Sequence, residues 1–176
     1  MRRLLDKFEA GFNRAMLFLA WLVAASIGLI AVLIPLNLFL VKFHLGSLWW
    51  LYEAVEYALF FGVFLGAPWV LQQGAHVRVD VFAAALPRRA AAGLEQIVDL
   101  AGATLCGFLS VYSTRAAISE FQDGTYPDKD LRIQTWYIVA VLALSFALLT
   151  IEFLLRLRRA RRVAQTEAAA ARQTGF

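Results

Sequence analysis

The sequence predicts an all-α integral membrane protein with four transmembrane helices, surrounded by a lipid bilayer. Apolar residues make up 61% of its 176 residues and charged residues only 17%. Soluble domains are nearer half apolar and a quarter charged, and a chain of this length is too short to bury the excess in one core. Four stretches also reach the roughly 20 apolar residues that a bilayer-spanning helix requires. We therefore expect lipid to cover much of the surface.

The N-terminal segment has a pattern of its own. Leu4, Leu5, Phe8 and Phe12 share one face of a helix over residues 1–14. This pattern predicts an amphipathic helix that lies in the membrane interface.

The first span covers residues 15–41 and contains no charged residue. It is longer than a signal-peptide core and lacks a convincing cleavage site, so we interpret it as an uncleaved span. Its excess length predicts a tilt, or a kink at Pro35.

Each of the other three spans has an acidic residue near one end. These spans cover residues 48–72, 94–117 and 135–155. Glu53 and Glu56 lie in the first two turns of the second span and Asp99 lies one turn inside the third. Glu152 closes the fourth span, and a basic tail of residues 156–176 follows it.

The basic residues are divided unevenly between the two sides of the membrane. The N-terminal segment, the loop between the second and third spans, and the tail hold most of them: Arg2, Arg3, Lys7, Arg14, Arg78, Arg88, Arg89, Arg156, Arg158, Arg159, Arg161, Arg162 and Arg172. Because Lys and Arg concentrate on the cytoplasmic side, both termini are predicted to be cytoplasmic in a bacterial inner membrane.

Small residues recur at every fourth position of the second span. They are Ala54, Ala58, Gly62 and Gly66, and the two glycines form a GxxxG pair. Small side chains let helix backbones approach closely inside a membrane. The stripe predicts a helix contact, either within this chain or with a partner.

Glu53, Glu56 and Tyr57 share one face of the second span. Two carboxylates in a membrane bind a cation or relay protons in some transporters. The alternative is that they lie in the periplasmic interface, where a helix N-terminus favours negative charge. Trp49 and Trp50 are typical of the aromatic belt at that depth, which favours the alternative.

Three ion pairs are expected from the positions of the charges. Asp99 is within reach of the arginines in the cytoplasmic loop, and Glu152 and Arg156 have the i,i+4 spacing of a helical pair. Arg115 ends the third span on the periplasmic side, so we expect it to pair with Glu53 or Glu56 and to fix the register of those helices.

The sequence lacks the parts of an enzyme. His44 and His76 fall on opposite sides of the membrane and cannot share a haem or a metal ion. Cys106 is the single cysteine, which excludes a disulfide or a thiolate metal site within the chain. No phosphate loop or Ser–His–Asp arrangement is found, so no catalytic residue, metal ligand or cofactor is assigned. The arginine-rich tail is interpreted as a lipid anchor rather than a nucleic-acid site.

Three short motifs resemble those of the small (Q) subunit of tripartite ATP-independent periplasmic (TRAP) transporters. They are LYEAVEY at residues 51–57, FLGAP at 64–68 and GAHVRVD at 74–80, which contains Gly74, His76 and Asp80, with Leu86 and Pro87 closing the loop. The resemblance in order and spacing covers residues 15–155. Glu56 stands where many relatives have an arginine, and residues 132–136 lack a proline common in the family.

The resemblance implies a role as a fixed scaffold in a sodium-coupled transporter of organic acids. The partners would be the large (M) membrane subunit, which holds the transport sites, and a periplasmic substrate-binding protein. The acidic segment 120–130 is either a docking contact for that protein or an ordinary solvated loop. Two other classes stay open: a membrane-anchor or electron-transfer subunit, and a stand-alone four-span exporter.

Overall fold

The computed structural model describes residues 2–73, 88–129 and 131–173. Its helices are α1 (Arg2–Lys42), α2 (Leu51–Gln72), α4 (Arg88–Asp123) and α5 (Thr135–Gln173). Each of the four is long and apolar enough to cross a membrane. The predicted fold class, an all-α protein with four membrane-spanning helices, is confirmed.

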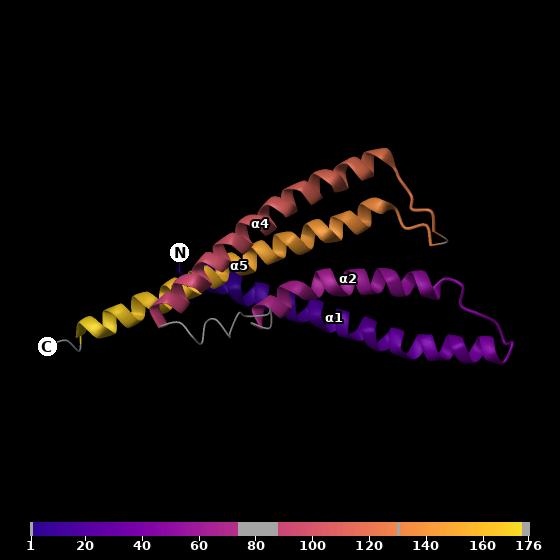
Figure 1. The fold of residues 1–176 in the computed structure, drawn as a ribbon, viewed down its shortest axis with the longest axis horizontal. Coiled ribbons are helices and arrows are strands. Elements are labelled where there is room, and N and C mark those ends of the chain that lie inside the picture. Colours follow the sequence, from indigo (N-terminus) through magenta and orange to yellow (C-terminus); the bar gives the residue numbers. More distant parts are fainter. Residues whose placement is uncertain (1, 74–87, 130, 174–176) are drawn as a thin grey trace.

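The helices form two hairpins, α1–α2 and α4–α5, which diverge like the arms of a V (Figure 1). Both chain termini lie on the side where the arms meet, which we call the terminal end. The opposite side, where each hairpin turns, is the loop end. The packing order is α1, α2, α5, α4, because α2 packs against α1 and α5, and α4 packs against α5.

Helix α1 runs without interruption for 41 residues and continues through Pro35. The segment predicted to lie in the membrane interface is therefore helical and continuous with the first span. Phe12 and Met16 from this region pack with Leu155 of α5 in a buried cluster. This contact holds the first part of α1 against α5, while its placement at the interface stays a prediction.

Helix α5 also extends far beyond a single membrane crossing. Its 39 residues correspond to about 58 Å at roughly 1.5 Å per residue. The hydrocarbon core is only about 30 Å thick. Part of α5 therefore projects beyond the bilayer at the terminal end.

The turns at the loop end are stabilised by specific polar groups. The buried Asn37 of α1 accepts a hydrogen bond from the backbone N–H of Leu48 at 2.8 Å, which joins α1 to the approach of α2. Gly124 follows α4 with φ 62°, and its N–H donates to the carbonyl of Glu120. Glycine is favoured here because a side chain is strained in this left-handed conformation.

The α4–α5 hairpin is closely packed along its length. A Cβ added to Gly102 of α4 would lie 2.7 Å from the ring of Phe153 on α5. Ser110 donates a hydrogen bond to the carbonyl of Ala143 at 3.3 Å. The backbones of α4 and α5 therefore approach each other closely.

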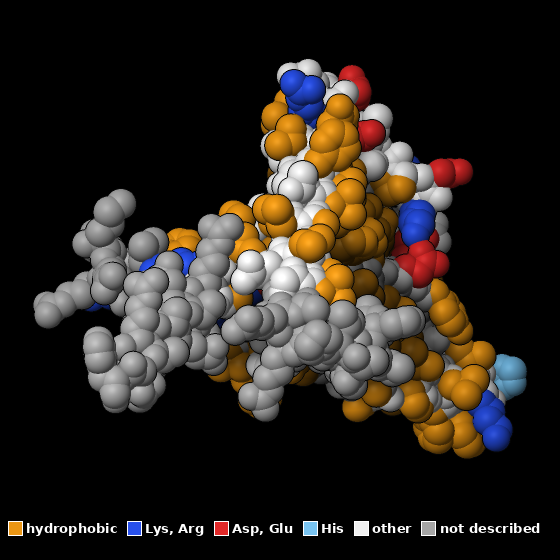
Figure 2. Space-filling view, turned by 60° about the vertical axis from the view of Figure 1, so that its left-hand side comes forward, with side chains coloured by type: hydrophobic (Ala, Val, Ile, Leu, Met, Phe, Trp, Pro, Cys, Tyr) orange, Lys and Arg blue, Asp and Glu red, His pale blue; other side chains and the backbone are white. Residues whose placement is uncertain are grey.

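On the face shown in Figure 2, hydrophobic side chains cover much of the described surface, while most of the visible Lys, Arg, Asp and Glu side chains lie toward the loop end. Exposed examples along the helices include Trp21, Val32, Val63, Leu105 and Phe108. Such a surface is stable in contact with lipid or with other membrane helices.

Candidate functional site

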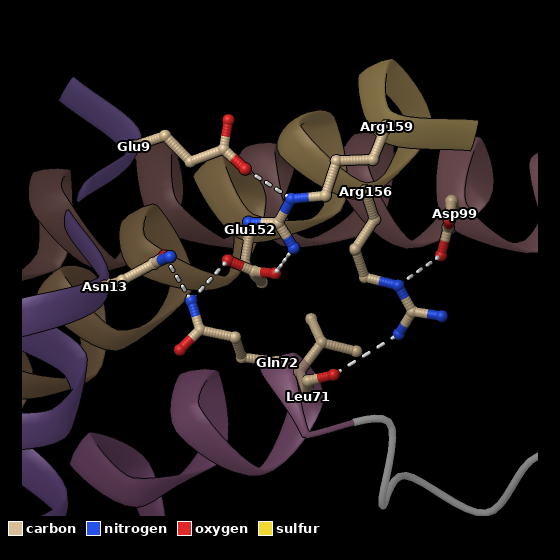
Figure 3. Close-up of polar contacts among 8 residues, drawn as sticks. All are labelled: Glu9, Asn13, Leu71, Gln72, Asp99, Glu152, Arg156 and Arg159. Atoms are coloured by element: carbon tan, nitrogen blue, oxygen red, sulfur yellow. Dashed lines mark hydrogen bonds and ion pairs between the residues drawn. The ribbon is translucent and has the colours of Figure 1, made fainter. Parts of the chain in front are cut away.

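The terminal end contains a network of polar side chains contributed by all four helices (Figure 3). We call it the terminal network, and its members are Glu9, Asn13, the carbonyl of Leu71, Gln72, Asp99, Glu152, Arg156 and Arg159. Charged groups buried between apolar helices are stable only when they are paired, because an unpaired charge in an apolar medium is costly.

Glu152 of α5 is the centre of this network and is fully buried. Arg159 donates to its carboxylate at 3.2 Å, and Gln72 of α2 donates to the other oxygen at 3.3 Å. The Gln72 amide also donates to Asn13 of α1 at 2.7 Å, and Arg159 donates to Glu9 of α1 at 2.5 Å. One buried carboxylate thus organises contacts among three helices.

A second branch of the network connects α4. Arg156 forms an ion pair with the buried Asp99 at 3.5 Å and donates to the carbonyl of Leu71 at 3.4 Å. Leu71 is near the end of α2, where carbonyl groups lack partners within the helix. Arg156 therefore joins the end of α2, and α4 at Asp99, to α5.

The prediction that Glu152 forms an ion pair with Arg156 is wrong. Glu152 pairs with Arg159, seven residues along, while Arg156 turns to Asp99 on the neighbouring helix. The i,i+4 rule concerns one isolated helix, and here a neighbouring helix offers a second carboxylate. The cytoplasmic-loop arginines considered for Asp99 lie outside the described side chains.

At the loop end, the connection between α4 and α5 folds over the start of α2. Lys129 forms a salt bridge with Glu56, and Glu53 accepts a hydrogen bond from the backbone N–H of Leu131 at 2.5 Å. The Lys129 ammonium also lies 5.0 Å from the centre of the Tyr57 ring, within reach of a cation–π contact. These contacts connect the two hairpins at their diverging ends.

The salt bridge has an electrostatic consequence for Lys129. The hydrogen bond to Glu56 is the main reason why the pKa of Lys129 lies above its ordinary value. Both partners are partly exposed, so water and salt screen their attraction and weaken the contribution to stability.

The predicted ion pair between Arg115 and a glutamate of α2 is not formed among the described residues. Glu56 instead forms a salt bridge with Lys129. The prediction assumed that α2 and α4 are neighbours. Helix α5 lies between them, and Arg115 is exposed.

A polar pocket of about 750 Å³ opens beside this contact. It is lined by Trp49, Glu53, Asp128, Lys129 and Arg132. Trp49 therefore lies beside charged side chains. It is also exposed, as expected for a residue that anchors the helix in the membrane interface. Trp50 precedes α2, and its carbonyl accepts the N–H of Ala54.

The small-residue stripe faces α1 over part of its length. A Cβ added to Gly62 would lie 3.5 Å from Val23, and one added to Gly66 would lie 3.9 Å from the same side chain. At least this half of the stripe packs within the chain. Ala54 and Ala58 are partly buried.

Several residues of the terminal network were missed from the sequence. Glu9 and Asn13 are four residues apart on α1, which places two polar groups on one helical face, and Gln72 ends α2. This spacing was a usable signal, but it did not identify partners on other helices. Gly74, His76 and Asp80 lie outside the described residues.

The described residues offer no cluster of three His, Cys, Asp or Glu side chains that could hold a metal ion. Fold and polar contacts together define a multi-pass helical membrane protein in which Glu9, Asp99 and Glu152 form contacts between helices.

Comparison with protein families identifies the chain more narrowly. The model of the DctQ component of tripartite ATP-independent periplasmic transporters matches residues 30–163. The chain belongs to this family of transporter components. No curated protein matches the chain.

Proposed function

We propose that this chain is the fixed small subunit of a sodium-coupled TRAP transporter for organic acids. It packs against the large membrane subunit and helps to receive the periplasmic binding protein. Membership of the DctQ family supports the transporter role. Both termini are proposed to be cytoplasmic, because the basic residues concentrate at that end.

The observation that carries the scaffold role is the internal pairing of the membrane carboxylates. Asp99 and Glu152 are engaged by Arg156 and Arg159 of the same chain. Glu53 accepts a backbone N–H and Glu56 binds Lys129. Carboxylates used in this way stabilise a helix arrangement, whereas a site for a moving cation needs ligands that exchange with the ion.

The loop end supports a role in receiving the binding protein. Its pocket combines exposed Trp49 with Asp128 and Arg132, and Trp and Arg are enriched in residues that dominate protein–protein binding. These residues are proposed to contact the binding protein when it docks.

Purification of the tagged chain from its native membrane tests the assembly. The large membrane subunit is expected to co-purify, and the reconstituted complex is expected to take up an organic acid with sodium. Sodium-driven uptake by this chain alone, or its purification as a stable monomer without the large subunit, would contradict the proposal.

Neutralising the α2 carboxylates tests the scaffold role separately. Glu53→Gln is expected to lower the yield of the complex, because Glu53 accepts the N–H of Leu131, while Glu56→Gln should have little effect on yield. Neither variant is expected to change the sodium dependence of uptake. A shifted sodium dependence in a fully assembled complex would instead assign these glutamates to ion coupling.

A further inference from the structure

A groove of about 630 Å³ runs along the α1–α2 hairpin. It is lined by side chains from residues 17–27 of α1 and 62–70 of α2, all of them apolar residues or glycine. Its volume falls within the range of roughly 300–1,000 Å³ that is typical of small-ligand sites. A membrane protein does not leave such a space empty, because unfilled space loses dispersion contacts.

The groove exists because small side chains occupy positions that face it. Ala20, Ala24 and Gly66 leave the space, while Trp21 and Trp69 add broad apolar surfaces to the lining. The two helices are close at the floor of the groove, where a Cβ added to Gly62 or Gly66 would lie 3.5 or 3.9 Å from Val23. The groove is therefore a shallow channel beside a formed helix contact.

The length of the groove corresponds to one leaflet. Residues 17–27 of α1 extend about 15 Å, half of the roughly 30 Å hydrocarbon core. Trp69 lies three residues before the end of α2, so the groove starts near the terminal end and extends along about half of a membrane crossing. A partner helix would cross both leaflets, whereas a lipid chain occupies one.

Two cations lie at the terminal end of this groove. Arg14 precedes the lining residues Leu17 and Trp21 by three and seven positions, which places it on the same strip of α1, and Lys7 lies two further turns back. Both are exposed, and neither forms an ion pair with a described residue, unlike Arg156 and Arg159. They are available to bind a phosphate group.

We propose that this groove holds an acyl chain of an anionic phospholipid from the cytoplasmic leaflet, with its phosphate bound to Arg14. The apolar lining contacts the acyl chain, and the exposed cation at the mouth of the groove favours a negatively charged headgroup. The leaflet follows from the orientation proposed above, and the site itself is independent of the transported substrate.

Photolabelling of the purified complex in nanodiscs tests the proposal. The probes are phosphatidylglycerol and phosphatidylcholine, each with a diazirine in the middle of one acyl chain. Phosphatidylglycerol is expected to label peptides that contain residues 17–27 and 62–70. Ala24→Leu fills the groove and should reduce this labelling severalfold, while Ala25→Leu, at the next exposed position outside the lining, should leave it unchanged.

Arg14→Gln provides a second variant that leaves the groove open. It should lower the preference for phosphatidylglycerol over phosphatidylcholine about fivefold, because one basic residue near an anionic membrane surface strengthens binding by about this factor. Equal labelling by both lipids in the wild type, or full labelling of Ala24→Leu, would overturn the proposal. Labelling of the chain alone that disappears in the complex would also overturn it, because a helix of the large subunit would then occupy the groove. Co-purification of that subunit is scored in the same samples, so failure of the proposed assembly is recognised separately.

Discussion

The two hairpins differ in how completely their helices cover each other. In the α4–α5 hairpin, a methyl group on Gly102 would meet the Phe153 ring at 2.7 Å, whereas in α1–α2 the equivalent distances from Gly62 and Gly66 to Val23 are 3.5 and 3.9 Å. In the most apolar stretch of α1, none of the residues is buried within the chain. In the corresponding stretch of α5, 28% of the residues are buried. The α4–α5 pair therefore has much of its packing within the chain, while α1 depends on lipid, a partner, and the contacts at the ends of the hairpins.

Loss of the shared carboxylate is expected to have the largest effect. Glu152→Ala removes the buried acceptor of Arg159 and Gln72, so it should destabilise the fold by about 3–5 kcal/mol, as for breaking other buried ion pairs. Thermal unfolding of the purified complex in nanodiscs measures this loss. Glu9→Ala, which removes a more exposed partner of the same arginine, should cost clearly less. Equal losses of stability in the two variants would show that Glu152 is not the centre of the terminal network.

Gly102→Ala tests the close packing of α4 and α5. The added methyl group overlaps the Phe153 ring, which should cost about 1–3 kcal/mol. Gly107→Ala is the matched control, because its Cβ would lie 3.7 Å from Thr150, in ordinary contact. Thermal unfolding should separate the two variants. A neutral Gly102→Ala would mean that the Phe153 ring moves aside and that the contact between the helices is less tight than described.

Gly62→Ala makes the corresponding change in the α1–α2 hairpin. Its methyl group would lie 3.5 Å from Val23, so the unfolding free energy should change by less than about 1 kcal/mol, with a small gain from removing a glycine within the helix. The difference between Gly102→Ala and Gly62→Ala measures the contrast between the hairpins directly. Equal destabilisation would remove that contrast.

Lys129→Ala should have the smallest effect, because the salt bridge with Glu56 is exposed to solvent. The raised pKa of Lys129 means that the lysine stabilises the fold while it is protonated, and this contribution is lost only as the pH rises through a value above its ordinary 10.5. Stability should therefore not vary through Lys129 between about pH 6 and 8. A change in unfolding temperature over that range that Lys129→Ala abolishes would contradict this assignment.

The four membrane-spanning helices could be predicted from the sequence because length and apolar composition are properties of each segment alone. The continuity of α1 was not predicted. Residues 1–14 are more polar than the first span, and this change in polarity suggested that one helix ends and another begins there. The helix instead continues without a break. Phe12 and Met16 instead find an apolar partner in Leu155 of another helix.

The partners of the charged residues could not be predicted in the same way. Spacing along one helix suggested Glu152 with Arg156, and similar depth suggested Arg115 with a glutamate. The actual pairs depend on which helices are neighbours, and α5 lies between α2 and α4. Gly102 was missed for a related reason, since its significance comes from the Phe153 ring on another helix.

The ion pair between Asp99 and Arg156 has a consequence for how the protein enters the membrane. Asp99 is translated well before Arg156, and at roughly 5–20 residues per second the carboxylate leaves the ribosome several seconds before its partner. An acidic residue makes the insertion of a single helix less favourable, and the ion pair with Arg156 offsets part of this cost. Helix α4 is therefore expected to be held more firmly in the bilayer once α5 has followed it.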